Sequence, residues 1–292
     1  MKRATVELLR CPTCLRELAL DGAEGDPVER GTLACDRGHT FEIAEGVPRL
    51  VHPSELLPSD AEFQRKYDVG ADEYDRGLRW LFESFRVDPA ATRNAMVDLL
   101  ELKPGARVLE TASGTGEDSQ YILQRIGANG TLYAQDLSVA MLRVARRKLA
   151  GGSVEYVQSN ASYLPFADDV FDAAFHFGGI NTFGEVRRAL EEMNRVVRVG
   201  SKVVVGDEAV APWLRRRLYG RILVKANPLY RHRPPLDALP GNASEVRIRW
   251  ILGNAFYVID FRVGAGPPFV DLDLPIPGKG DSLRSRYYGP RE

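Results

Sequence analysis

Short apolar runs alternate with amphipathic stretches through the middle of the chain. The runs predict strands near 107–111, 131–136, 153–158, 171–176 and 202–207, and the stretches predict helices near 117–126, 138–149 and 183–198. Strands that alternate with helices form a parallel sheet. Two later runs, 244–251 and 256–263, predict an antiparallel pair of strands at its end. We therefore expect an α/β fold whose ligand site lies where the parallel strands end.

The segments around this core differ from it in pattern. We expect a small turn-rich module over 1–55, a helical linker or lid over 56–105, the core domain over 106–264 and a tail over 265–292. The linker predicts helices near 61–76 and 89–102 and is rich in aromatic residues. We expect Trp80 and Phe82 to pack against the sheet, whereas Tyr74 could either pack there or cover the ligand site. The tail contains a turn-rich stretch at 274–281 and Gly289-Pro290, and the pattern does not decide whether it is ordered.

The first strand of the core leads into a turn of small residues. Glu110 lies near the end of that strand, Ala112, Gly114 and Gly116 follow it, and Asp136 ends the second strand twenty residues after Gly116. A strand, a small-residue turn, a helix start and a second strand with a terminal carboxylate are typical of a nucleotide-type binding site.

Two acidic residues at the helix start narrow the type of ligand. A dinucleotide site needs a third glycine where this chain has Glu117, and Asp118 follows it. Both carboxylates would repel a pyrophosphate at the positive end of a helix. We therefore expect a nucleoside ligand without phosphates, and S-adenosylmethionine fits that description.

Three downstream segments, at 136–142, 159–172 and 191–207, follow in the order found in class I S-adenosylmethionine-dependent methyltransferases, and the chain resembles that family over roughly a third of its length. The resemblance implies a Rossmann-like, seven-stranded sheet. It implies that Glu110 and the Gly114 to Gly116 turn hold the methionine end of the cofactor and that Asp136 accepts hydrogen bonds from the ribose. The other cofactor-binding residues that it implies are Ala112, Leu137, Met141, Asn160, Ala161 and Phe177.

Two positions depart from the family pattern. Ala112 stands where the family usually has glycine, which is tolerable if the backbone there keeps a negative φ. Asn160 stands where the family usually has aspartate, so the site loses a charge-assisted bond to the adenine amino group. On the sequence alone, Asn160→Asp is expected to tighten cofactor binding.

The loop after the fourth strand contains the candidate catalytic residues. Residues 176–181 resemble the Phe-Gly-x-x-Asn loop of ubiquinone and menaquinone biosynthesis methyltransferases. His176 could act as a general base, because its ordinary pKa lies near neutrality, and Asn181 could orient a substrate oxygen. The alternative is that His176 is a hydrogen-bonded structural residue.

All three cysteines of the chain lie in the first 40 residues. Cys11, Cys14, Cys35 and His39 form two close pairs that offer three thiolates and one imidazole, a closed set for structural zinc. The alternative is three free cysteines and a surface histidine. The module resembles the zinc ribbon of ribosomal RNA guanine methyltransferases and the zinc-ribbon proteins that activate certain methyltransferases.

Composition indicates an ordinary globular protein and helps to rank the functions. Charged residues make up 27% of the 292 residues, the net charge is −1, and neither a signal peptide nor a membrane span is evident, so we expect a cytoplasmic protein. The leading interpretation is a methyltransferase for a small-molecule or lipid-like acceptor. An RNA methyltransferase is second, because residues 1–50 carry seven basic and nine acidic residues rather than a positive excess. A non-catalytic zinc-ribbon interaction protein is third.

One basic segment is hidden by the nearly neutral total. Residues 211–250 carry nine Lys or Arg against two Asp or Glu, and 213–225 predicts an amphipathic basic helix. The segment could be a solvated face, or it could contact an acidic substrate or a membrane surface peripherally.

Overall fold

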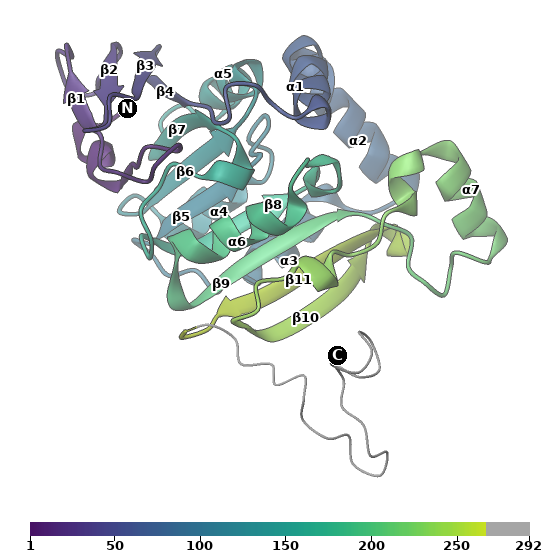
Figure 1. Ribbon diagram of the computed structural model, residues 1–292. Coiled ribbons are helices and arrows are strands. Elements are labelled where there is room, and N and C mark those ends of the chain that lie inside the picture. The colour runs from purple at the N-terminus through teal and green to yellow at the C-terminus, as the bar shows by residue number, and fades with distance from the viewer. Residues whose placement is uncertain (267–292) are drawn as a thin grey trace.

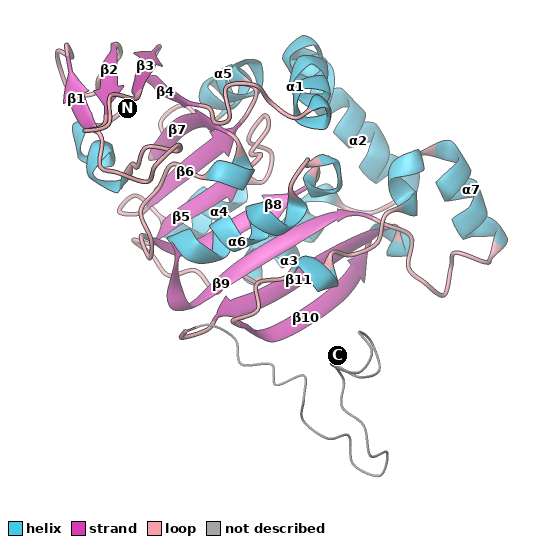
Figure 2. Cartoon of the chain, viewed as in Figure 1, coloured by secondary structure: helices cyan, strands magenta, loops and turns pink. Residues whose placement is uncertain are grey.

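The computed structural model describes residues 1–266 and has a central sheet with helices on both faces (Figure 1). Five strands of the core are parallel: β5 (Arg107–Thr111), β6 (Thr131–Asp136), β7 (Val154–Ser159), β8 (Phe171–Phe177) and β9 (Val197–Glu208). The antiparallel pair is β10 (Ala243–Ile251) and β11 (Phe256–Val263). Their order is β7-β6-β5-β8-β9-β11-β10, which confirms the expected seven-stranded methyltransferase sheet (Figure 2).

The two faces of this sheet bury different clusters of apolar side chains. Leu190 and Met193 of α6 (Val186–Val196) pack with Val203 and Val205 on one face. Val97 of α3 (Pro89–Asp98) and Ile122 of α4 (Ser119–Ile126) pack with Val204 on the other. Successive strand residues point to opposite faces, so strands covered on both sides are apolar throughout, and this is why the sequence located them well.

The N-terminal module is continuous with the core sheet, which the sequence did not predict. Its strands are β1 (Ala19–Asp21), β2 (Gly31–Ala34), β3 (Thr40–Ala44) and β4 (Val47–Leu50). Strand β4 pairs in parallel with β7 through Arg49 opposite Gln158 and Leu50 opposite Ser159, so one sheet joins eleven strands. The buried side chains of Leu9 and Leu33 belong to the same cluster as Phe166 of the core domain. The module therefore packs its small apolar core onto that of the larger domain.

The linker contains one helix more than expected. The observed helices are α1 (Pro58–Gly70), α2 (Tyr74–Phe85) and α3, with a turn of 3-10 helix at 71–73 between the first two. Phe82 is buried as expected, but the expectation for Trp80 was wrong, since it is 70% exposed. These two side chains lie on opposite sides of α2, an amphipathic helix whose inner face covers the core domain.

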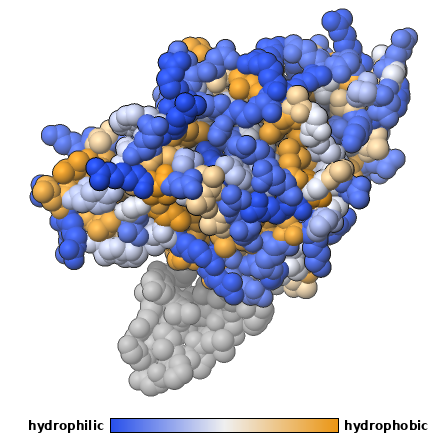
Figure 3. Space-filling view, turned by 180° about the vertical axis from the view of Figure 1, so that it is seen from behind, coloured by the Kyte–Doolittle hydropathy of each residue, from blue (hydrophilic) through white to orange (hydrophobic). Residues whose placement is uncertain are grey.

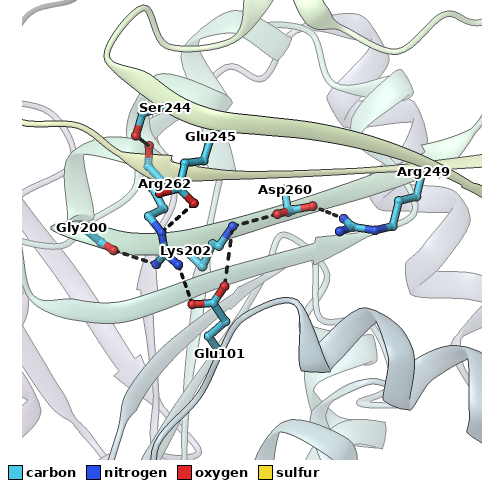
Figure 4. A network of polar contacts seen from close by, with 8 residues as sticks. All are labelled: Glu101, Gly200, Lys202, Ser244, Glu245, Arg249, Asp260 and Arg262. Atoms are coloured by element: carbon cyan, nitrogen blue, oxygen red, sulfur yellow. Dashed lines mark hydrogen bonds and ion pairs between the residues drawn. The ribbon is translucent and has the colours of Figure 1, made fainter.

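A network of charges around a buried ion pair fixes the antiparallel end of the sheet (Figure 4). Lys202 on β9 is fully buried and donates to Asp260 on β11 at 2.8 Å, and Arg249 on β10 pairs with the other oxygen of Asp260. Arg262 pairs with Glu101 at 2.6 Å and with Glu245 at 3.1 Å. The network joins three strands to the segment after α3, so it sets their register.

Two predicted segments remain, the basic helix at 213–225 and the tail, and the tail lies almost entirely beyond residue 266. The basic segment forms a helix, α7 (Leu218–Ala226), which begins later than expected because turns occupy the residues before it. The expectations for 274–281 and Gly289-Pro290 fall outside the described residues. None of the helices in 1–266 is long and apolar enough to cross a membrane.

Candidate functional site

Glu110 lies in a buried position at the start of the small-residue turn. Its side chain is only 3% exposed, and Ser119 at the start of α4 donates a hydrogen bond to its Oε2 at 2.5 Å. Burial and, to a smaller extent, the neighbouring Asp118 raise the pKa of Glu110 to about 8. The free protein therefore holds this carboxyl protonated at neutral pH, ready to ionise beside a cation.

The backbone of the turn differs from the expectation at Ala112. Its φ is +48°, in the left-handed region, so the condition of a negative φ is not met. This conformation costs an alanine about 1 kcal/mol relative to glycine. The turn is held by Gln135, whose Oε1 accepts from the Ala112 amide at 3.2 Å. Gly116 has a φ of +80°, and a Cβ there would lie 2.9 Å from Leu149. The absence of a side chain at Gly116 therefore allows the turn to pack against Leu149.

Asp136 links the turn to the second strand. Its Oδ2 accepts from the Gly114 amide and its Oδ1 from the Ser138 amide, both at 2.8 Å. Burial raises the pKa of Asp136 to about 6 in spite of these bonds. The carboxylate is thus oriented toward the space beside the turn, as a group that accepts from ribose hydroxyls must be.

A pocket with an empty volume of about 690 Å³ lies over these strand ends. Asp136, Ala112 and Gly114 line it. So do the predicted residues Leu137, Met141, Asn160 and Ala161. The structure therefore brings most of the sequence-predicted cofactor residues together around one cavity.

A second pocket, of about 580 Å³, adjoins the first, and both are lined by Tyr74, Ala112, Gly114 and Gly178. Its polar lining includes Glu110, Ser113 and Thr115. Its apolar lining includes Leu81, Phe82, Phe177 and Phe256. Phe177, predicted as a cofactor residue, thus lines the second pocket and not the first. Tyr74 lines both pockets. Of its two expected roles, packing against the sheet or covering the ligand site, the structure therefore favours the second.

The lid helices close over both pockets through polar contacts that sequence reasoning missed. Gln64 of α1 donates to the Leu137 carbonyl at 3.1 Å, and Ser138 donates to Asp68 at 2.5 Å. Asp75 of α2 accepts from Thr115 at 2.5 Å and pairs with Lys148 at 2.6 Å. The Tyr74-Asp75 pair was the sequence signal for these contacts. The residues that Asp75 contacts, Thr115 and Lys148, could not be predicted because they lie far along the chain.

Asp60 of α1 lies beside Asn160, the position that lacks the family's aspartate. Asn160 Nδ2 donates to Asp60 Oδ2 at 3.4 Å, and the Gly184 amide donates to Asp60 Oδ1 at 2.9 Å. The oxygen of Asn160 already accepts from the Ser162 amide at 2.9 Å. Both Asp60 and Asn160 line the first pocket. A carboxylate is therefore present here after all, but the lid supplies it.

The acidic residues before α4 are paired, which weakens the argument that they repel a pyrophosphate. Asp118 forms a buried ion pair with Arg93 of α3 at 2.6 Å, and Glu117 pairs with Lys148. Their charges are therefore balanced within the protein, and neither carboxylate stands free at the helix start. These two carboxylates therefore do not by themselves disfavour a ligand with phosphates.

The candidate catalytic residues lie beside the pockets rather than in their lining. His176 is fully buried, its Nδ1 faces Thr111 at 3.0 to 3.1 Å, and burial lowers its pKa to about 4. Asn181 donates to the Glu208 carbonyl at 2.7 Å and accepts from Tyr257 at 3.3 Å. Both positions favour a structural role, so the catalytic roles stay predictions.

A pair of carboxyl groups at the end of β9 was missed by the sequence analysis. Asp207 is fully buried and accepts from the amides of Asn181 and Glu208 at 2.6 and 2.8 Å. Glu208 lines the second pocket. Burial and the adjacent Asp207 hold the pKa of Glu208 well above its ordinary value. An acidic pair at a strand end was the signal that could have identified it.

The four predicted metal ligands come together in the N-terminal module. The ligand atoms of Cys11, Cys14, Cys35 and His39 all lie within 4.8 Å of one another. His39 Nδ1 is 3.3 to 3.6 Å from the three sulfurs, and the sulfurs of Cys14 and Cys35 are 3.9 Å apart. Zinc with Zn–S bonds of about 2.3 Å has tetrahedral edges of about 3.8 Å. The four distances given are close to such an edge, so these residues could together hold a tetrahedral metal ion.

Comparison with known sequences agrees with this reading of the core. Residues 69–211 match the ubiE/COQ5 methyltransferase family. A demethylmenaquinone methyltransferase of Paenarthrobacter aurescens is 33% identical over 180 residues, which cover 60% of this chain and 64% of that protein. A ubiquinone/menaquinone biosynthesis C-methyltransferase of Hahella chejuensis is 33% identical over 144 residues, which cover 48% and 54%. The chain thus spans only about half to two thirds of these relatives' length.

Comparison with solved structures confirms the fold. Phosphoethanolamine N-methyltransferase 2 of Haemonchus contortus, solved with S-adenosyl-L-methionine, superposes with a TM-score of 0.55 and 14% identity. The match covers 77% of this chain and 63% of that one. At this identity the likeness concerns the fold alone. Residues 69–211 therefore carry the sequence pattern of the ubiE/COQ5 methyltransferase family on a Rossmann-like methyltransferase fold.

Proposed function

We propose that the chain is an S-adenosylmethionine-dependent methyltransferase whose acceptor is a small, lipid-like molecule of the kind used in quinone biosynthesis. The observation that carries the proposal is the joined pair of pockets over the ends of β5 and β6. One pocket carries the residues suited to an adenosine, and the other joins polar groups to an aromatic wall. The relatives named above, a demethylmenaquinone methyltransferase and a C-methyltransferase of quinone biosynthesis, support the acceptor class.

The residues of the first pocket fit the adenosine end of the cofactor. Asp136 would accept from both ribose hydroxyls, because its carboxylate is fixed by two backbone amides. Leu137 and Met141 would pack on the adenine ring, and Asp60 with Asn160 would meet its polar edge. Glu110, which lines the adjoining second pocket, would meet the amino group of the methionine end, since a buried carboxyl without an ion-pair partner among residues 1–266 favours an ammonium ligand. Bound S-adenosylmethionine supplies an activated methyl group on a sulfonium.

The second pocket fits an acceptor with an apolar ring and a removable proton. Phe177 and Phe256 form the aromatic wall, and their ring centroids lie 5.9 Å apart. Glu208 lies in the same lining and could take or share the acceptor's proton. Methyl transfer is an in-line displacement, so the lid and this wall would act mainly by aligning the acceptor and excluding water.

The direct test is methyl transfer from labelled S-adenosylmethionine to reduced demethylmenaquinone. We expect labelled product from the parent protein and none from Asp136→Ala, which removes the ribose acceptor. Glu208→Gln should lower kcat by about 100-fold if the carboxyl moves a proton, with little change in KM. Binding of S-adenosylhomocysteine without transfer to any quinol would refute the acceptor class, and absence of binding would refute the proposal as a whole.

We also propose that Cys11, Cys14, Cys35 and His39 hold a structural zinc ion. The tetrahedral dimensions of the cluster support this, and four protein ligands leave no position for water. Purified protein should contain one zinc per chain by elemental analysis. Cys14→Ser should lower that content, whereas Thr13→Ser, a neighbour outside the cluster, should not. A parent protein that contains no zinc and is unaffected by Cys14→Ser would refute the site.

A further inference from the structure

The helix α7 and the turn before it expose large apolar side chains to solvent. Trp213 is 57% exposed, Leu218 is 74% exposed and Ile222 is 56% exposed. Leu218 and Ile222 are four residues apart, so they lie on one face of the helix. Figure 1 shows α7 at the outer edge of the molecule, and Figure 3 shows hydrophobic and strongly hydrophilic residues side by side at that edge. Large apolar side chains that are exposed next to one another indicate a binding surface, whereas single ones scattered over a protein do not.

The charges around this patch have one sign. Residues 209–236 contain seven Lys or Arg and no Asp or Glu. Arg217, Arg221 and Lys225 are spaced four residues apart, which forms a basic stripe next to the apolar face. No ion pair joins any of the seven basic side chains to the residues from 1 to 266. Many Lys and Arg elsewhere in that range form ion pairs that tie separate elements together, whereas none of these seven does.

The inner face of α7 touches the wall of the acceptor pocket. Leu223 and Val224 pack on a cluster that contains Phe82, Tyr230 and Phe256. Phe82 and Phe256 also line the second pocket. Helix α7 and the apolar cluster beneath it therefore lie between the exposed patch and the second pocket.

The combination of an apolar face and a basic stripe fits one partner best. A second copy of the chain would bring like charges together, and a nucleic acid would leave Leu218 and Ile222 without an apolar partner. An anionic bilayer satisfies both parts, because apolar side chains enter between the headgroups while Arg and Lys meet lipid phosphates. We propose that α7 with Trp213 docks the protein on an anionic membrane surface, so that a lipid-like acceptor reaches the second pocket from the bilayer.

Docking itself does not depend on the methyltransferase activity, and only the delivery of the acceptor rests on the proposed function. The test measures binding of the full-length protein to vesicles of phosphatidylcholine with and without phosphatidylglycerol. One variant pair compares Leu218→Asp/Ile222→Asp with Val199→Asp, an exposed apolar residue on β9. A second pair compares Arg217→Gln/Arg221→Gln with Arg30→Gln/Lys103→Gln, which removes two exposed charges elsewhere. Binding of S-adenosylhomocysteine and the thermal unfolding midpoint show that each variant is folded.

We expect the parent to bind only the anionic vesicles. Leu218→Asp/Ile222→Asp should bind at least about tenfold more weakly, and loss of two basic side chains should cost roughly fivefold each at low salt. Both controls should bind like the parent. Brominated lipid should quench the tryptophan fluorescence less in Trp213→Phe than in the parent. Equal binding by all variants, or binding to single-stranded RNA with no binding to anionic vesicles, would overturn the proposal, whether or not the protein methylates a quinol.

Discussion

At the scale of single residues, we expect Glu110 to couple the proposed cofactor site to pH. Its pKa of about 8 in the free protein would fall when the ammonium of the cofactor arrives, so binding releases a proton below that pH. Affinity for S-adenosylhomocysteine should therefore rise between about pH 6.5 and 7.5, by up to tenfold per unit. Isothermal titration across this range should show the rise in the parent and a flat profile in Glu110→Gln.

Protonation of Glu110 has the opposite effect on the stability of the free protein, which should fall as pH rises. The carboxyl is raised from 4.5 to about 8, so between these values the folded chain binds more protons than the unfolded chain. The free energy of unfolding should therefore fall as pH rises through this window. Urea titrations should show a smaller fall in Glu110→Gln, while Glu83→Gln, an exposed carboxyl on α2, should follow the parent. Identical slopes for Glu110→Gln and the parent would contradict a buried, protonated Glu110.

Asn160 shows how a partner from the lid changes a prediction made from sequence. Asn160→Asp would place two carboxylates side by side, since Asp60 is 3.4 Å away, and binding of S-adenosylhomocysteine should weaken by about tenfold rather than tighten. The exchange Asp60→Asn/Asn160→Asp keeps the charge and both backbone partners, so it should recover most of the affinity. Tighter binding by Asn160→Asp alone would show that the lid carboxylate is not part of the site.

At the scale of elements, the network in Figure 4 holds β9, β10 and β11 together around one buried ion pair, Lys202 with Asp260. Asp260→Asn would leave the buried Lys202 with only the half-exposed Glu101 at 3.9 Å as a counter-charge, which costs about 3 kcal/mol in the free energy of unfolding. Arg249→Gln should cost much less, because Arg249 is 40% exposed. Chemical denaturation of the three proteins measures the difference. Lys202→Met/Asp260→Leu should restore most of the stability, and a loss equal to that of Asp260→Asn would contradict the electrostatic cause.

Elements whose signal is local were predicted well, and those that depend on distant partners were not. Strands β5 and β6 are apolar because both of their faces are covered, and the sequence placed them at their observed bounds. Helix α2 was missed because its residues at 74–76 were read as the end of one longer helix, whereas a 3-10 turn separates it from α1. The candidate cofactor residues on strand ends were located by position, and the adjacent pair Asp207-Glu208 could have been. Asp60 could not, because its partner Asn160 lies 100 residues along the chain.

At the scale of the whole molecule, the N-terminal module and the core domain share a sheet and a core. The pairing of β4 with β7 and the contacts of Leu9 near Phe166 mean that loss of the module exposes apolar surface of the core domain. A metal-bound module of some 50 residues that folded alone would leave the larger domain unaffected by chelation. Here the two parts should instead behave as one cooperative unit.

Removal of zinc should therefore destabilise the entire protein and not only its first 55 residues. Calorimetry should show a single transition whose midpoint falls in Cys14→Ser and in protein treated with a chelator, because β4 then no longer covers β7. Thr13→Ser should keep the parent midpoint. Hydrogen exchange gives the sharper readout, since amides of β7 and β6 should lose protection together with those of β2 and β3. Two separate transitions, with the second unchanged by metal removal, would show that the shared sheet does not couple the two parts.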